Sequence, residues 1–125
     1  MNKNLVIAIV ALVIVVACGV AEVVWINDGY GKLAEKCDSL IQMCDDLTLT
    51  VEIYGEFADE WYELRETSEL LLPHNDVYEL NLRVSEAESY VAKGDFDSAR
   101  AQLVVASQLL RYVPHLIVPN FKHVF

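Results

Sequence analysis

The chain has 125 residues, a formal net charge of −10 and a hydrophobic fraction of 54%. This length allows one small domain, and the hydrophobic fraction excludes an acidic disordered protein, which cannot be so apolar. The acidity disfavours nucleic-acid binding, because affinity for nucleic acid depends on cationic side chains that contact phosphate. High hydrophobicity together with high charge predicts that the chain is divided into segments of different character.

The N-terminal segment predicts a membrane-spanning helix. Residues 5–21 contain no charged side chain, and the apolar sequence resumes after Glu22 and reaches Ile26. As a helix, residues 5–25 would extend about 31 Å, which matches a hydrocarbon core of about 30 Å. A domain of this size has few places to bury so long an apolar run, so a membrane anchor is favoured over a buried helix.

A bacterial lipoprotein signal is the alternative interpretation of this segment. Residues 15–18 read Val-Val-Ala-Cys, which resembles a lipobox with Cys18 as the lipidated residue. Lys3 supplies the positive charge that precedes either kind of segment. Apolar residues continue after Gly19, whereas a lipobox normally precedes a polar spacer, so the uncleaved anchor is favoured.

The charges on either side of the span predict its orientation. Lys3 precedes the span and Asp28 follows it. The positive-inside rule therefore places residues 1–4 in the cytoplasm, residues 5–26 in the cell membrane as a single-pass anchor, and residues 27–125 outside as an extracytoplasmic helical domain.

Apolar residues beyond the span recur at alternating spacings of four and three as far as Trp61, which indicates a long helix with a coiled-coil-like seam. We expect this helix over residues 30–72, after a hinge at the glycine-containing segment 27–31 and before a proline. A period-two alternation over residues 47–54 is consistent with a local break in it.

Two shorter helices follow. We expect them over residues 75–92, capped by Asn75 or Asp76, and over residues 96–113. The short turn at 93–95 would make them an antiparallel hairpin, and an irregular C-terminal tail would pack across the bundle. The predicted fold is therefore all-α, with an N-terminal transmembrane helix followed by a long acidic helix packed on an antiparallel helical hairpin.

The membrane-proximal half of the long helix lacks a partner in this scheme. As one helix, residues 30–72 would extend about 65 Å, whereas the two shorter helices would extend about 27 Å each. Either a parallel homodimer forms through this stalk, which is slightly favoured, or a break near residues 48–55 folds the stalk against the rest. The residues of this seam are Leu33, Cys37, Leu40, Cys44 and Leu47. Its two cysteines are interpreted as small core residues, with an intermolecular disulfide as the alternative.

The negative charge is concentrated in the long helix. Between Glu35 and Glu69 there are 11 acidic and two basic residues. The densest part of this region predicts a solvated acidic face, with docking of a basic partner or loose divalent-cation binding as alternatives. The residues of this face are Glu56, Asp59, Glu60, Glu63, Glu66 and Glu69.

Motifs for catalysis or for cofactor and metal binding are missing from the sequence. His74, His115 and His123 are scattered and form no HExxH motif, and no CxxC, GxSxG or phosphate-binding glycine loop occurs. We therefore expect no enzyme, no catalytic residue, no cofactor and no metal site.

Several short motifs carry a family resemblance. They are the N-terminal span, Trp61, Pro73-His74-Asn75-Asp76-Val77 with Glu79-Leu80, Gly94-Asp95, Leu109-Leu110 to Pro114, and Asn120-Phe121-Lys122-His123-Val124-Phe125. Together they resemble a family of small bacterial single-span membrane proteins that is known as a domain of unknown function (four-three-six-three, in words). This resemblance covers nearly the whole chain, implies a retained span rather than a cleaved signal, and implies no activity and no catalytic residues.

These observations favour an interaction or scaffolding module anchored in the membrane. Its expected partners are the membrane, another membrane or envelope protein, and a second copy of the chain, and no nucleic acid. The alternative is a lipoprotein, lipidated at Cys18, that binds a cation or a small solute.

Overall fold

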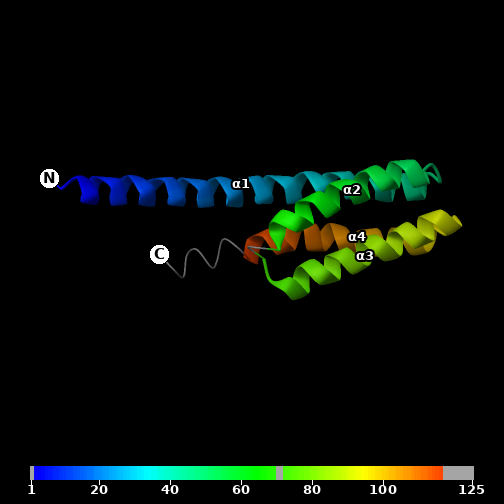
Figure 1. Ribbon diagram of the computed structural model, residues 1–125. Coiled ribbons are helices and arrows are strands. Elements are labelled where there is room, and N and C mark those ends of the chain that lie inside the picture. The colour runs from blue at the N-terminus through cyan, green and yellow to red at the C-terminus, as the bar shows by residue number, and fades with distance from the viewer. Residues whose placement is uncertain (1, 70–71, 117–125) are drawn as a thin grey trace.

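The computed structural model describes residues 2–69 and 72–116 of the chain. These residues form an all-α structure (Figure 1), which confirms the predicted fold class. Its elements are α1 (Lys3–Asp45), α2 (Val51–Ser68), α3 (His74–Lys93), α4 (Phe96–Tyr112) and the short 3-10 helix η1 (Val113–Leu116). The predicted irregular tail, from residue 117 onward, lies outside the described residues.

The helix α1 continues without interruption from the apolar segment into the bundle. The hinge predicted at residues 27–31 is therefore wrong, because tertiary packing of α1 offsets the cost of its glycines, about 1 kcal/mol each in a helix. A Cβ atom at Gly29 would lie 3.0 Å from Cδ1 of Leu64 in α2, whereas one at Gly31 would meet open space. Gly29 thus allows α2 to approach α1 closely.

The predicted single helix over residues 30–72 is in fact two helices, with a turn at residues 46–50 between them. The chain reverses at Leu47, whose φ of 59° lies in the left-handed region. The amide of Leu47 donates to the carbonyl of Cys44 at 3.2 Å, and the amide of Thr48 donates to that of Met43 at 2.9 Å. This is the Schellman pattern of helix termination, here with leucine where glycine is usual.

A threonine then starts α2. The side chain of Thr50 accepts a hydrogen bond from the amide of Ile53 at 3.2 Å, which is the usual N-cap contact. Figure 1 shows α2 returning along α1. Of the two arrangements expected for the stalk, the structure therefore has the break that folds it back within one chain.

The antiparallel hairpin of α3 and α4 agrees with the prediction. Gly94 ends α3 with a φ of 74°, and Asp95 caps α4 by accepting from the amide of Ser98 at 3.2 Å. At the other end of α3 the prediction of a cap at Asn75 or Asp76 is wrong. Both residues lie inside the first turn, and the preceding Pro73 forms no side-chain cap.

The four helices form an up-and-down bundle (Figure 1) in which α1 packs on α2 and α4, and α3 packs on the same two helices. On α1 the buried residues begin at Ile26. The largest fully buried side chains are Trp61, Tyr30, Tyr54, Ile26, Leu80, Leu103 and Leu110. Each helix thus buries the stripe of apolar residues that its periodicity predicts.

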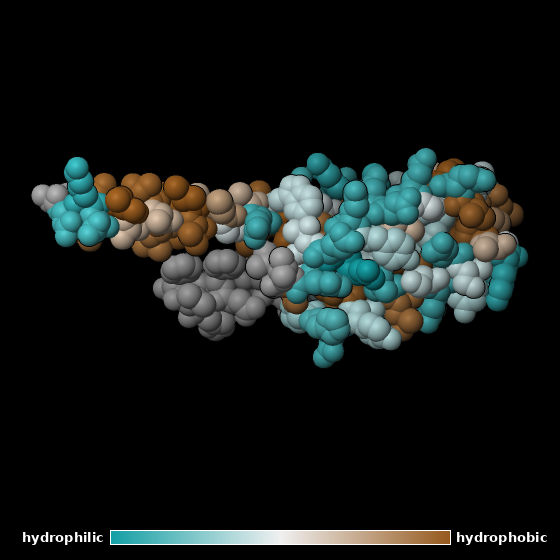
Figure 2. Space-filling model, viewed as in Figure 1, coloured by the Kyte–Doolittle hydropathy of each residue, from teal (hydrophilic) through white to brown (hydrophobic). Residues whose placement is uncertain are grey.

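The N-terminal half of α1 protrudes from this bundle as a single apolar rod (Figures 1 and 2). Large apolar side chains from Leu5 to Val24 are exposed along it. Among the described residues, α1 is the helix that is long and apolar enough to cross a membrane, and none of its most apolar stretch is buried.

Candidate functional site

The six carboxylates of the predicted acidic face all belong to α2 or directly follow it, and they fall into two groups. Glu56, Glu60 and Glu63 line shallow grooves between α1 and α2. Asp59, Glu66 and Glu69 line neither groove, and Glu69 forms an ion pair with Arg65 at 3.7 Å. The predicted face is therefore exposed, but it is divided between a groove and an outward surface.

The outward group includes a carboxylate that sequence reasoning missed. Glu52, Asp59 and Glu66 are seven residues apart in turn, so they lie on nearly the same side of α2 over about 21 Å. All three side chains are exposed, and none has an ion pair among the described residues. We call these three residues the acidic stripe. The spacing of seven residues is present in the sequence. It places Glu52 on the same side as Asp59 and Glu66 because the break at residues 46–50 leaves Glu52 in the first turn of α2.

The first groove lies between α1 and α2 at the end of the bundle from which the apolar rod emerges. Its volume is about 240 Å³, and its lining combines apolar, cationic and anionic side chains: Trp25, Asp28, Gly29, Lys32, Leu33, Lys36, Glu60, Glu63 and Leu64. Lys32 pairs with Asp28 at 3.1 Å across one turn of α1. Glu63 has no ion pair among the described residues, so this groove holds an uncompensated carboxylate.

A second, smaller groove of about 160 Å³ follows along the same two helices. Lys36 and Glu60 line both grooves and form an ion pair between α1 and α2. The rest of its lining includes the apolar side chains of Met43, Ile53 and Phe57. The ion pair thus joins the two helices where the grooves meet.

The predicted stalk seam is closed within one chain. Leu33, Cys37, Leu40 and Cys44 are buried, and the remaining member, Leu47, is 70% exposed at the turn. The thiol of Cys37 donates to the carbonyl of Leu103 in α4 at 3.2 Å. The interpretation of this seam as an open surface for a second copy is therefore wrong, because other helices of the same chain cover it.

The two seam cysteines are free thiols in the core. Burial raises the pKa of Cys37 to about 12, with the neighbouring Asp38 carboxylate adding to the effect. Burial also raises the pKa of Cys44. These side chains behave as small core residues rather than as partners in an intermolecular disulfide. Cys18 is exposed on the protruding half of α1, and its lipidation stays a prediction.

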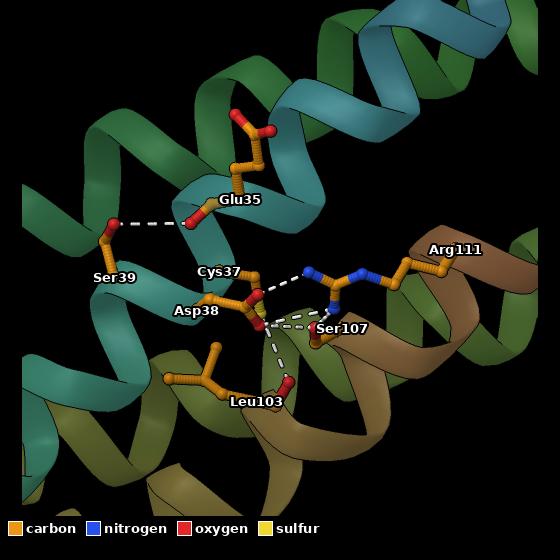
Figure 3. Close-up of polar contacts among 7 residues, drawn as sticks. All are labelled: Glu35, Cys37, Asp38, Ser39, Leu103, Ser107 and Arg111. Carbon is orange, nitrogen blue, oxygen red and sulfur yellow. Dashed lines mark hydrogen bonds and ion pairs between the residues drawn. The ribbon is translucent and has the colours of Figure 1, made fainter.

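A polar junction joins α1 to α4 (Figure 3). Asp38 of α1 forms an ion pair with Arg111 and accepts a hydrogen bond from the Ser107 hydroxyl at 2.7 Å. The hydrogen bond from Arg111 holds the pKa of Asp38 below its usual value. Further along the same pair of helices, Arg100 pairs with Asp45 at 2.8 Å. All four ionised side chains are about half exposed, so each pair contributes at most about 1 kcal/mol and mainly sets how the helices align.

Trp61 is the centre of a second group of contacts, which ties three helices together. Its ring packs edge-on against Tyr30 of α1, with the ring centroids 6.0 Å apart. Its indole nitrogen donates to the side-chain oxygen of Asn81 in α3 at 3.2 Å, and Arg65 donates to the same oxygen at 3.1 Å. The Tyr30 hydroxyl lies beside Ser68 but has no hydrogen bond among the described residues, and burial raises its pKa to about 12. These contacts stabilise the position of α2.

The two histidines in the described part of the chain belong to different elements. His74 begins α3 and is exposed, His115 lies in η1, and His123 is outside the described residues. Among the described residues, no group of three or more histidine, cysteine, aspartate or glutamate side chains is placed to hold a metal ion.

Comparison of the chain with protein-family models, curated proteins and solved structures finds no match. The family resemblance read from the sequence motifs therefore stays a prediction.

Proposed function

We propose that this protein is a single-pass membrane protein whose four-helix bundle docks a basic segment of another membrane or envelope protein. The observation that carries the proposal is the unbroken α1, which leaves the bundle as an exposed apolar rod. The anchor and the bundle therefore share one helix, so the bundle is held rigidly on the anchor, close to the membrane surface. Such rigidity suits a scaffold that presents a surface at a constant distance.

The orientation of the proposed anchor follows from the charges that flank it. Lys3 precedes the apolar segment, whereas Lys32 and Lys36 beyond it are ion-paired with Asp28 and Glu60, so the positive-inside rule favours a cytoplasmic N-terminus and an extracytoplasmic bundle. A C-terminal fusion to alkaline phosphatase, which folds only outside the cytoplasm, should be active. A C-terminal fusion to green fluorescent protein should not fluoresce, and the opposite pattern would reverse the proposed orientation.

The N-terminus separates the anchor from the lipoprotein alternative. Mass spectrometry of the protein extracted from membranes should show a chain that begins at Met1. A chain that begins at a diacylated Cys18 would support the lipoprotein and contradict the transmembrane anchor. Recovery of the chain without detergent would contradict both the anchor and the lipoprotein.

The acidic stripe is the surface that we assign to the partner. Glu52, Asp59 and Glu66 are exposed and have no ion pair among the described residues, whereas residues 72–116 carry six acidic and four basic side chains. Complementary charge of this kind speeds association and selects partners more than it adds affinity. The favoured partner therefore presents basic residues along one face over about 21 Å.

Site-specific photocrosslinking in cells tests this assignment. Gly55 lies beside the stripe on α2, and a side chain added there meets open space, so a photoreactive residue can replace it. We expect crosslinks to a protein with a basic segment, which are lost in the Asp59→Asn/Glu66→Gln variant. The Glu86→Gln/Glu88→Gln variant removes the same charge from α3 and should retain them. Equal loss in both variants would contradict the stripe as the docking surface.

A further inference from the structure

The groove between α1 and α2 begins at the depth of the lipid headgroups when α1 spans a membrane. For a span of residues 5–26, Asp28 stands about 3 Å and Lys32 about 9 Å beyond the hydrocarbon core. The headgroup layer is roughly 5–8 Å thick on each side. Trp25, which is 56% exposed and lines the same groove, stands at the boundary where tryptophan is enriched in membrane proteins. The end of the groove at Trp25 and Asp28 therefore lies among headgroups, and Lys32 stands just outside this layer, where its flexible side chain can still reach a phosphate.

The groove carries both signs of charge. Its ionised side chains are the carboxylates of Asp28, Glu60 and Glu63 and the ammonium groups of Lys32 and Lys36. Three negative and two positive charges make a net of −1, which disfavours an anionic ligand. A ligand with one cationic and one anionic group matches this lining better than either charge alone.

Two side chains are available to such a ligand. Glu63 is exposed and has no ion pair among the described residues. The Lys32–Asp28 pair is mostly solvated, with side-chain exposures of 73% and 63%. A solvated pair across one helical turn is worth only a few tenths of a kcal/mol, so Lys32 can turn to another anion at little cost.

The size and the apolar part of the lining limit the class of ligand. The volume of about 240 Å³ lies just below the range of about 300–1,000 Å³ that is typical of pockets for drug-sized molecules. A small headgroup fits this space better than a large solute does. Leu33 and Leu64 line the groove as well, and they can contact the glycerol and the first methylene groups of a lipid.

We propose that this groove binds the headgroup of a zwitterionic phospholipid that carries a primary ammonium group, as in phosphatidylethanolamine. The ammonium group donates to Glu63, and the phosphate accepts from Lys32. The bound lipid belongs to the leaflet on the side of the membrane where the bundle lies, and it holds the bundle at the membrane surface. This inference depends on the membrane anchoring proposed above, but not on the acidic stripe.

Lipid retention by the full-length protein tests the site. The chain is reconstituted into nanodiscs of phosphatidylcholine mixed with equal parts of phosphatidylethanolamine and phosphatidylglycerol, and native mass spectrometry identifies the lipids that stay on the released protein. We expect phosphatidylethanolamine to be retained at least about threefold above its share of the bilayer, and Glu63→Gln to abolish this enrichment. Lys32→Gln should lower the retention of all three phospholipids.

Matched variants separate the groove from overall charge. Glu88→Gln removes one negative charge from an exposed position on α3, as Glu63→Gln does on α2. Lys93→Gln removes a lysine at the end of the bundle far from the groove. Both control variants should retain lipid as the unmodified chain does. Loss of enrichment in Glu88→Gln equal to that in Glu63→Gln would overturn the site, as would enrichment of phosphatidylglycerol or of no lipid. Circular dichroism of each variant verifies that the helical content is unchanged. A chain that does not enter nanodiscs contradicts the anchor itself, whereas a chain that enters without enrichment contradicts only the headgroup site.

Discussion

Replacement of Tyr30 and Trp61 by leucine, singly and together, tests whether α2 returns along α1. In one continuous helix over residues 30–72, these two residues would stand about 46 Å apart. In the folded-back bundle their ring centroids are 6.0 Å apart in an edge-to-face arrangement. The two arrangements therefore differ in whether the residues can interact at all.

The expected magnitudes follow from the contacts. Trp61→Leu removes part of a fully buried ring and the hydrogen bond to Asn81, so we expect a loss of about 2–4 kcal/mol in the free energy of unfolding. Tyr30→Leu should cost about 1–2 kcal/mol, because it also removes a buried hydroxyl that lacks a hydrogen bond. Since either change removes the aromatic pair, the double variant should be more stable than the sum predicts by about 0.5–1.5 kcal/mol.

Urea unfolding of the full-length protein in mild detergent, followed by far-ultraviolet circular dichroism, measures these free energies. The pair Trp61→Leu and Val91→Ala is the control. Val91 lies on α3, ten residues beyond Asn81, the hydrogen-bond partner of Trp61, so the losses in unfolding free energy of these two variants should add within about 0.5 kcal/mol. A coupling between Tyr30 and Trp61 no larger than that of the control would refute the folded-back arrangement.

Three further predictions concern the α1 helix. Gly31→Ala should stabilise the protein by up to about 1 kcal/mol in thermal unfolding, whereas Gly29→Ala should gain less or lose, because its Cβ meets α2; equal gains would contradict the close helix approach. Cys37, with the other two cysteines replaced by alanine, should resist a maleimide at neutral pH and react in urea, because it is buried with its pKa raised to about 12; rapid labelling of the folded protein would contradict its burial. The hydrogen bond from Arg111 lowers the pKa of Asp38 in the folded protein. The ionised Asp38 therefore stabilises the fold fully above the pKa of an unfolded aspartate, about 3.9, and this stabilisation is lost as the pH falls through the lower pKa of the folded state. Asp38→Asn should therefore cost at most about 1 kcal/mol at neutral pH and nearly nothing once the carboxyl is protonated, and a cost independent of pH would refute this account.

Local patterns were enough to predict much of this fold. The apolar run of residues 5–26 and the periodicity of residues 75–92 and 96–113 depend on neighbours at most four positions apart, and so does the turn at Gly94, whose positive φ suits glycine. These features were predicted correctly as helices and as a hairpin because each helix or turn is favoured by its own residues. The exposed carboxylates of α2 followed from the same kind of pattern.

The fate of the long acidic segment depended on contacts between distant residues. The spacing of its apolar residues is equally consistent with one long helix that pairs with a second copy and with two helices that pair within one chain. The choice depends on whether residues such as Cys37 and Leu40 find a partner in α4, and no local pattern contains that information. The cost of a left-handed Leu47 is small beside the burial of this seam, so the chain breaks there and α1 stays straight through its glycines.

The sequence by itself determined that this protein is all-α, acidic and equipped with an apolar N-terminal helix, because these properties belong to composition and short-range periodicity. Only the tertiary structure decided that the apolar N-terminal segment and the bundle share one helix and that α2 folds back along it. The same arrangement divides the carboxylates of α2 between the outward stripe and the groove, since side chains about 30 residues apart along the chain meet there only when the helices pack.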